Sequence, residues 1–220
     1  MTSMPSGWIL AGLGVVAALL AACAAGPAAP DWRVNAVGHL QRYEQAWLAG
    51  RSRAARREFD SARAETTRTG RADLVARVEL TRCALQVASL DFGPCDGFAP
   101  LAADAGPGER AYARYLRGQA SPQDVANLPS QHQAIAAGGA DLAAIGDPLA
   151  RLVAGGVLLQ QTRIAPAQVA DMVETASGQG WRRPLLAWLG VQLKLAEQAG
   201  DIATAAHLRR RMDLVQPARP

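Results

Sequence analysis

The feature that most restricts the fold is a series of helix-forming runs separated by breaks of one or two residues. Between residues 31 and 90, apolar side chains recur at helical spacing in three runs, which end at Gly50, at Gly70 and near Leu90. Helices joined by such short connections pack antiparallel against each other. The segment therefore predicts three antiparallel helices, over about 31–50, 52–69 and 72–90.

A second helical block is expected after residue 147. Asp147 and Pro148 combine an N-cap residue with a proline at the first helical position, and predict a helix to about residue 161. Further helices are expected over 166–177, 182–199 and 201–215, with Trp188 filling the core. The sequence lacks the period-two alternation typical of strands. The expected fold class is all-α, built from antiparallel helical hairpins.

The segment 91–147 differs in composition and in charge. Glycine and proline recur every few residues, which argues against long regular elements. Short helices are expected over 109–117 and after Ser121, where Pro122 and Asp124 complete an N-terminal cap. The segment has three arginines and seven acidic residues, whereas 31–90 has eleven arginines and seven acids. Residues 148–220 have nine basic and five acidic residues. Either the acidic segment docks across two basic blocks, or the three are independent solvated surfaces.

The N-terminus predicts export. Residues 8–22 are apolar and uncharged, but about fifteen residues are fewer than the roughly twenty that span a membrane, and a signal-peptide core has this length. Leu20, Ala21, Ala22 and Cys23 resemble the bacterial lipobox, in which an aliphatic and two small residues precede the cysteine that is lipidated. The absence of Lys and Arg from residues 1–7 departs from the usual signal peptide.

The lipobox resemblance implies a lipoprotein whose first mature residue is Cys23. It implies a signal peptide over 1–22, acyl chains on Cys23 and a tether over 23–30. The helix signals along the remaining chain predict one helical domain over 31–220. More than one acyl chain gives stable membrane anchoring. Because Ala24 rather than Asp follows the cysteine, the resemblance favours the periplasmic face of the outer membrane. The alternative is an uncleaved N-terminal anchor in which Cys23 is simply a small residue.

Small and aromatic residues after two helix-stopping glycines resemble the second half of a tetratricopeptide repeat. These positions are Gly50, Ala55, Phe59 and Ala62, and again Gly200, Ala205 and Pro217. Tyr43 and Leu193 stand where the repeat usually has a small residue, and the middle of the chain fits no 34-residue period. The resemblance implies a degenerate tetratricopeptide-like fold, and a generic helical bundle is the alternative.

Cys83 and Cys95 remain once Cys23 is set aside, an even number for an oxidising compartment. The chain turns between them at residues 92–94 and can reach back to the helix that carries Cys83. We therefore predict a disulfide worth roughly 3 kcal/mol, with two unpaired core cysteines as the alternative. Without a nearby histidine or a C-x-x-C pattern the pair is a poor zinc site, so neither a metal nor a cofactor is expected.

The sequence contains none of the catalytic motifs considered below. His39, His132 and His207 are scattered, and the sequence has no metalloprotease, nucleophile-elbow or phosphate-loop pattern. Ser130 and His132 are interpreted as structural. The protein is accordingly predicted not to be an enzyme.

Two groups of basic residues are candidate contact sites. Arg51, Arg53, Arg56 and Arg57 are candidates for contact with anionic lipid headgroups or with an acidic partner, and a solvated helical face is the alternative. Nucleic acid is not an expected partner, given the periplasmic address and the lack of interleaved aromatic residues.

The second group is Trp181, Arg182 and Arg183, which begins a predicted helix. Tryptophan and arginine are enriched at binding hot spots, so these residues are candidates for partner binding. The alternative is that Trp181 staples the start of the helix. Cations are unfavourable at a helix N-terminus, and a compensating acid from 91–147 is expected.

These inferences converge on an outer-membrane-anchored periplasmic lipoprotein. It is expected to act as a protein-interaction or assembly accessory of an envelope system, with the membrane reached through its N-terminal lipid and an envelope protein as its partner. The alternative is a helical module that binds a lipid or a small apolar ligand.

Overall fold

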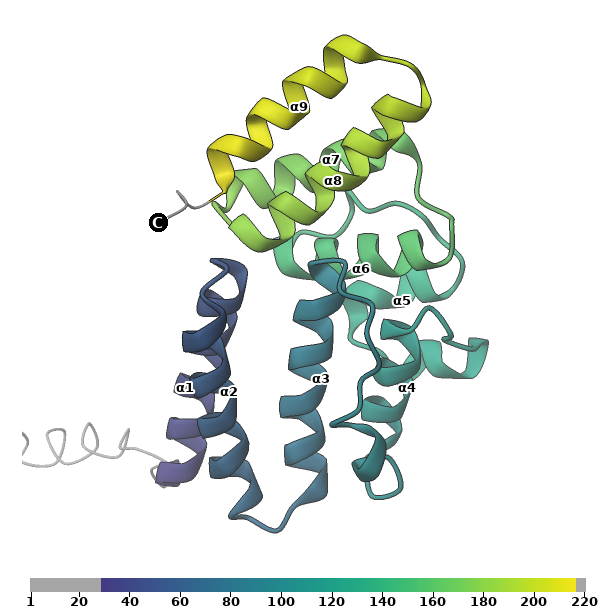
Figure 1. Ribbon diagram of the computed structural model, residues 1–220. Coiled ribbons are helices and arrows are strands. Elements are labelled where there is room, and N and C mark those ends of the chain that lie inside the picture. The colour runs from purple at the N-terminus through teal and green to yellow at the C-terminus, as the bar shows by residue number, and fades with distance from the viewer. Residues whose placement is uncertain (1–28, 217–220) are drawn as a thin grey trace, which may run out of the picture. The chain divides into compact units, whose positions relative to one another are not determined.

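The computed structural model describes residues 29–216, and every regular element in that range is a helix, which confirms the all-α prediction (Figure 1). Residues from Trp32 onward form one compact unit. Within the described range no helix has both the length and the apolar character needed to cross a membrane. The predicted signal peptide, the lipobox with Cys23, most of the tether and Pro217 lie outside the described residues.

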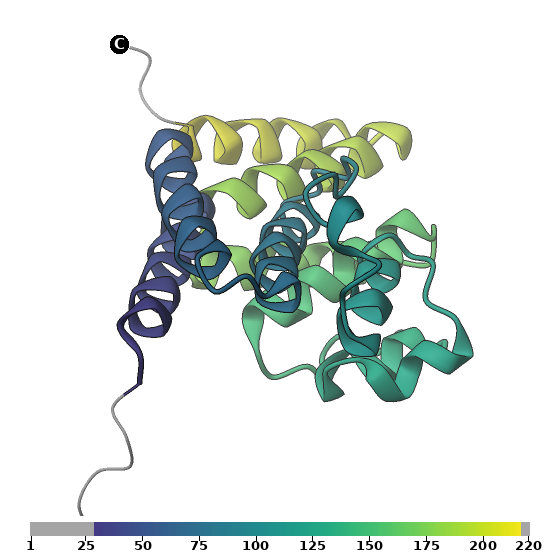
Figure 2. The same ribbon diagram turned by 90° about the horizontal axis from the view of Figure 1, so that it is seen from below.

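The first block consists of α1 (Asp31–Leu48), α2 (Ser52–Thr67) and α3 (Ala72–Ala88). Gly50 and Gly70 stop the first two helices with φ of +76° and +66°, a backbone region that favours glycine. In both views α3 lies between the α1–α2 pair and α4 (Figures 1 and 2). The helix α3 ends slightly earlier than predicted, because Leu90, with φ of +58°, turns the chain away.

The middle segment holds η1 (Ala99–Leu101), α4 (Pro107–Leu116), η2 (Pro122–Asn127) and α5 (Ser130–Ala136). The cap predicted at Ser121 begins η2, which is a 3₁₀ helix. The backbone N–H of Ser121 donates to Asp124 Oδ2 at 2.8 Å, and Arg114 Nε donates to the same oxygen at 2.9 Å. These bonds hold the pKa of the Asp124 carboxyl well below its usual range, with the Arg114 bond the largest cause.

The middle segment packs against both helical blocks, since α4 contacts both α3 and α6. Most polar links are hydrogen bonds from side chains of the second block to middle-segment carbonyls. Gln160 Nε2 donates to Leu116 O at 3.0 Å, and Arg163 Nη2 donates to Gly139 O at 3.0 Å. Among the ion pairs of the described residues, Arg77–Glu109 alone joins the acidic segment to a basic block. Apolar packing and hydrogen bonds to backbone carbonyls, more than ion pairs, hold the segment in place.

The second block consists of α6 (Pro148–Gln160), α7 (Pro166–Gly178), α8 (Arg182–Gln198) and α9 (Ile202–Val215). Asp147 caps α6 by accepting a 2.7 Å bond from the backbone N–H of Ala150, as the sequence predicted. The helices α7, α8 and α9 follow one another as neighbouring hairpins, coloured green to yellow in Figure 1.

The larger core forms where α3 and α6 cross and the later helices cover them. Gly156 allows the crossing, because a Cβ on this residue would collide with the backbone oxygen of Val87. Trp188 is fully buried, as predicted, and its Nε1 donates to Ala88 O at 3.2 Å. This hydrogen bond joins α8 to the end of α3, and thus to the first block.

A smaller core fills the space between α1, α2 and α3. Tyr43 on α1 packs against Phe59 on α2, with ring centroids 5.3 Å apart. Tyr43 is only 2% exposed. Its large side chain occupies a position where a tetratricopeptide repeat has a small one. These aromatic rings form the base of the cleft described next.

Candidate functional site

A cleft of about 430 Å³ opens between α1, α2 and α3. Three stripes of side chains line it, one from each helix. They are Tyr43 and Trp47, then Ser52, Ala55, Arg56, Phe59 and Asp60, and finally Arg82 and Gln86. Residues three or four apart lie on the same face of a helix. The side chains of each stripe therefore face the cleft together. The result is an aromatic base with a polar rim.

Arg82 connects this cleft to a buried ion-pair network. Its guanidinium carbon lies 5.0 Å from the centre of the Phe59 ring, and its Nη2 lies 2.9 Å from Glu79 Oε2. Arg63 Nε donates to Glu79 Oε1 at 2.8 Å. Glu79 is 2% exposed, and a buried carboxylate is tolerated only when cations and hydrogen bonds surround it. Glu79 thereby fixes Arg82 in the wall of the cleft.

Two buried hydrogen-bond donors at the cleft have no acceptor within the described residues. They are the Tyr43 hydroxyl and the Nε of Arg82. Burial raises the pKa of Tyr43, while the nearby charges of Arg82 and Arg183 act against that rise. The phenol therefore stays protonated at neutral pH and remains a donor. Unpartnered buried donors are uncommon in native proteins.

The predicted contact residues at the start of α8 lie at the edge of this cleft. Arg183 Nε donates to Trp47 O at 2.8 Å, and its Nη2 donates to Ser52 Oγ at 2.7 Å. Burial lowers the pKa of Arg183. Because Trp47 O belongs to the C-terminal turn of α1, the guanidinium meets the negative end of that helix dipole. A carbonyl group and an aromatic ring compensate the cation at short range. Asp91, an acidic residue of the segment 91–147, also acts on it electrostatically.

Trp181 and Arg182 occupy different surroundings from Arg183. Trp181 is half-buried and packs against both core clusters, which agrees with a stapling role. Arg182 is half-buried and lies near Gly50. The three residues therefore do not form one exposed patch, and Arg183 makes its hydrogen bonds within the chain.

The arginine run on α2 is exposed along its whole length. Arg51, Arg53, Arg56 and Arg57 are all exposed, and Arg56 lines the cleft. The structure therefore brings one member of this run together with Tyr43, Phe59 and Arg82. Sequence reasoning missed Arg82, because its neighbours in the chain are mostly core residues. Its position one turn after Glu79 on α3 was the available signal.

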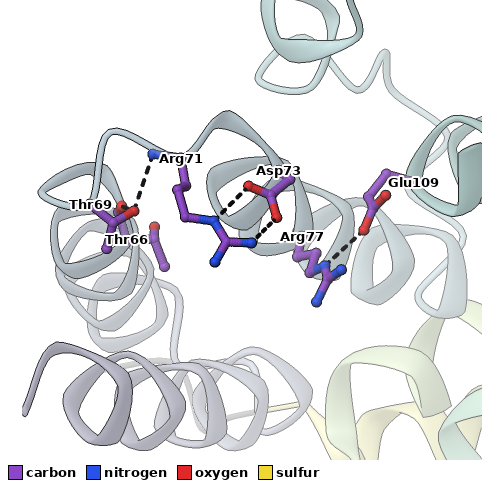
Figure 3. Close-up of polar contacts among 6 residues, drawn as sticks. All are labelled: Thr66, Thr69, Arg71, Asp73, Arg77 and Glu109. Atoms are coloured by element: carbon purple, nitrogen blue, oxygen red, sulfur yellow. Dashed lines mark hydrogen bonds and ion pairs between the residues drawn. The ribbon is translucent and has the colours of Figure 1, made fainter. Parts of the chain in front are cut away.

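A second hollow of about 370 Å³ lies between α3, α4 and the loop before α5. Arg77 and Glu109 border it, and Arg77 Nε donates to Glu109 Oε1 at 2.7 Å (Figure 3). In the same view Arg71 binds Asp73 through two nitrogens, while its backbone N–H donates to the Thr69 hydroxyl. These latter contacts fasten the turn between α2 and α3.

A buried histidine packs against two aromatic rings, one of which belongs to Tyr112 in the lining of the second hollow. His132 is 2% exposed, and its ring centre lies 4.8 Å from that of Tyr115 and 5.6 Å from that of Tyr112. Burial lowers the pKa of His132 to about 4, although Asp147 acts in the opposite direction. The imidazole is therefore neutral at pH 7. Its Nδ1 has no partner within the described range.

The predicted disulfide residues meet in space. Cys83 on α3 and Cys95 lie at disulfide-bonding distance, with their Cα atoms 5.8 Å apart. The loop that carries Cys95 also brings Gly97 against the Glu79 carboxylate, where a Cβ would collide with it. Across residues 29–216 there is no cluster of three or more side chains suited to a metal.

Comparisons with protein-family models, with curated proteins and with solved structures find no match to this chain. The fold alone does not define a function. The chemistry of the cleft is therefore the basis for the proposal below.

Proposed function

We propose that this protein is a lipid-anchored accessory of the bacterial envelope that binds another envelope protein through its first helical block. The supporting observation is the cleft between α1, α2 and α3, in which Tyr43, Trp47 and Phe59 lie beside Arg56 and Arg82. Aromatic residues and arginine dominate binding hot spots. The remaining helices and the middle segment provide a rigid support for that surface.

We also propose a cellular location for the protein, on the basis of the lipobox resemblance at residues 20–23. Lipidation at Cys23 holds the domain at the periplasmic face of the outer membrane, and the exposed arginines of α2 can contact anionic headgroups. In that oxidising compartment Cys83 and Cys95 form a disulfide. The tetratricopeptide-like character of the hairpins is also part of the proposal.

Crosslinking in intact cells tests the function. The protein carries a C-terminal tag, and crosslinked material is captured and identified by mass spectrometry, with Cys23→Ala as the control for anchoring. We expect one envelope protein to be captured specifically, and the capture to fall with Cys23→Ala. An intact lipidated protein that captures no envelope protein would contradict the proposal.

A variant in α8 shows whether the partner binds at the start of α8 or in the cleft between α1, α2 and α3. Arg182→Ala removes a candidate contact without disturbing the internal bonds of Arg183. If the partner binds at the start of α8, Arg182→Ala reduces its capture. If the partner binds the cleft alone, capture is unchanged by Arg182→Ala and is lost when Arg56 is replaced.

The second hollow favours a second candidate function, binding of a small apolar ligand. Leu80, Tyr112 and Leu128 line it, and its volume lies in the range of small-molecule sites. Native mass spectrometry and solvent extraction of protein purified from its source test this candidate. A bound lipid or other small molecule in stoichiometric amount would support it, and a ligand-free protein would count against it.

A further inference from the structure

We infer that five arginines where α2 and α8 begin form one basic patch, which binds the anionic phospholipid headgroups of the membrane that anchors the protein. The basic patch consists of Arg51, Arg53, Arg56, Arg57 and Arg182. The inference rests on the proposed function, because it assumes acyl chains on Cys23. It goes further by adding an arginine of α8 to the arginine run on α2 and by fixing how the domain lies on the bilayer.

The fold brings an arginine of the second helical block to the run on α2. Arg182 is half-buried, and its Nε lies 3.9 Å from the position that a Cβ on Gly50 would take. Arg183 holds the two helix starts together, since its Nη2 donates to Ser52 Oγ at 2.7 Å. In Figure 1 the start of α8 accordingly lies beside the turn between α1 and α2. Arg51 and Arg182 are far apart in the chain but belong to one surface.

The arginines of the basic patch have no internal partners. Within the described residues none of the five makes a side-chain hydrogen bond or an ion pair, whereas other acids of α2 are already engaged. Glu58 accepts from Arg42 Nε at 2.9 Å, and Glu65 pairs with Arg68. The intrahelical ion pairs of an ordinary solvated helix face therefore do not form at the basic patch.

The basic patch has a clear excess of positive charge. Asp60 lies one turn beyond Arg56 and Arg57, and a single carboxylate cannot neutralise five cations. Both α2 and α8 begin without a side-chain cap and without an acidic residue in the first turn. Cations are unfavourable at a helix N-terminus, so helix stability does not explain why Arg53 and Arg182 stand there. An external anionic surface would relieve this repulsion.

The composition of the surface favours headgroups over a protein partner. The large apolar side chains that are exposed in the described residues lie elsewhere, at Val34, Val37, Phe92, Ile202 and Leu214. A protein interface has an apolar core, whereas clusters of about four to eight basic residues bind anionic lipids through charge. Arg53 and Arg57 do not line the cleft between α1, α2 and α3. The basic patch therefore extends away from the proposed partner site.

The tether brings the basic patch within reach of the bilayer. Cys23 and Asp31 are eight residues apart, so the tether spans at most about 27 Å. The helix α1 has 18 residues, is about 27 Å long and separates the tether from the basic patch. An upright α1 would require a fully extended tether, so α1 lies along the bilayer when the acyl chains and the basic patch bind together. An acyl anchor and a basic cluster are two signals that reinforce each other.

Chemical modification of the full-length lipidated protein on vesicles tests the inference. Phenylglyoxal, which modifies accessible arginines, is applied to protein anchored in vesicles of phosphatidylcholine alone, or of phosphatidylcholine and phosphatidylglycerol in equal amounts. Peptide mass spectrometry follows each arginine. Because the acyl chains hold the protein on both vesicles, a difference reports the headgroup charge. The basic patch should react at least about fivefold more slowly on the anionic vesicles, which corresponds to about 1 kcal/mol per arginine.

Arg117 is the internal control. It is exposed at the end of α4, and α3 lies between that helix and α2 (Figures 1 and 2). Its reaction should be equally fast on both vesicles. High salt should remove the protection of the basic patch, because it screens exposed charges.

A pair of variants shows whether the arginines act together. Arg57→Gln should speed the modification of the four remaining patch arginines on anionic vesicles, because each charge helps to hold the others at the surface. Arg117→Gln, which removes an equal charge elsewhere, should have no such effect. Neither arginine makes a side-chain bond in the described residues, so both variants should keep the circular dichroism spectrum of the wild type.

Three outcomes would overturn the inference. The first is equal reaction of the basic patch on the two vesicles, or slowing of Arg117 to the same degree. The second is equal protection by inorganic phosphate on phosphatidylcholine vesicles, which would assign the basic patch to a soluble anion. The third is protection that appears only with an acidic envelope protein bound, which would assign it to a protein.

The failure of the inference and the failure of the proposed function are distinguishable in the same preparation. The intact mass of the purified protein shows whether Cys23 carries acyl chains. Acylated protein whose basic patch reacts equally on both vesicles would overturn the inference and leave the proposed function standing. Protein without acyl chains that anionic vesicles still protect would contradict the proposed anchor and leave the headgroup site standing.

Discussion

The guanidinium carbon of Arg183 lies 4.1 Å from the centre of the Trp47 ring, while its Nε donates to the backbone oxygen of that same residue at 2.8 Å. Trp47 in turn donates from Nε1 to Leu85 O at 3.1 Å. Residues far apart in the chain thereby join α8, α1 and α3 at one point. This contact links the second helical block to the wall of the cleft.

Loss of the Arg183 guanidinium should destabilise the fold. Arg183→Gln removes charge-assisted hydrogen bonds and a cation–π contact, and should lower the free energy of unfolding by about 1–3 kcal/mol. Arg183→Lys should recover only part of this, because an ammonium cannot reproduce the planar contact. Urea unfolding followed by circular dichroism measures the change. Arg182→Gln is the matched control, and an equal loss in that variant would contradict a special role for Arg183.

Two of the helical glycines, Gly156 and Gly190, should respond to alanine with opposite signs. Alanine is the better helix former by about 1 kcal/mol, and nothing stands near a Cβ at Gly190. Gly190→Ala should therefore leave stability unchanged or raise it. At Gly156 the Cβ would meet the backbone of Val87, and overpacking costs about 1–3 kcal/mol. Thermal unfolding of both variants tests the crossing of α3 and α6, and a stabilised Gly156→Ala would refute it.

Reduction of the cysteine pair should weaken the first block. A loop closed by residues twelve apart in sequence contributes about 3 kcal/mol if the bond is unstrained. The unfolding free energy should fall by about that amount when a reductant is added, whereas a Cys83→Ala/Cys95→Ala variant should be insensitive to the reductant. Non-reducing peptide mapping measures the bond directly. Recovery of both residues as free thiols from protein isolated from its native source would contradict the disulfide.

The buried histidine should make stability depend on pH. In the unfolded chain a histidine has a pKa near 6.5, whereas burial lowers the pKa of His132 in the folded protein to about 4. The unfolded state therefore binds more protons between these values. The stabilisation is complete above about pH 6.5 and is lost as the pH falls toward 4. The loss attributable to His132 is about 3 kcal/mol.

A pair of histidine variants isolates this effect. His132→Gln should flatten the stability profile between about pH 6.5 and 4. His207→Gln is the matched control, because His207 is exposed on α9. Urea unfolding at several pH values measures both. A wild-type slope that survives in His132→Gln would show that other groups carry the pH dependence.

Much of the local structure was predictable because short-range chemistry specifies it. The Asp147 cap, the proline at the start of α6 and the stops at Gly50 and Gly70 act within a few residues of themselves, and each lies where it was expected. The burial of Trp188 was likewise expected. The contact between Arg183 and Trp47 was not, because local sequence does not specify which carbonyl a distant arginine reaches.

The candidate site also has features that the sequence predicts and features that it does not. The arginine run on α2 and the aromatic residues of α1 and α2 were visible as patterns, but their convergence with Arg82 was not. The hollow near His132 was also missed, because nothing in the local sequence shows that the rings of Tyr112 and Tyr115 pack against the imidazole. Burial changed the chemistry of His132 and of Tyr43, and burial is a property of packing.

The sequence by itself determined that this protein is helical, where most of its helices begin and end, and which cysteines can pair. Helix caps, glycine stops and apolar spacing act over one or two turns, so they need no knowledge of the remainder of the chain. Only the tertiary structure decided that Tyr43, Phe59 and Arg82 share one cleft, that Glu79 is buried behind it, and that Arg183 turns inward. These outcomes depend on how the faces of different helices pack against one another. Such packing joins residues that are far apart in the sequence, so no local sequence pattern specifies it.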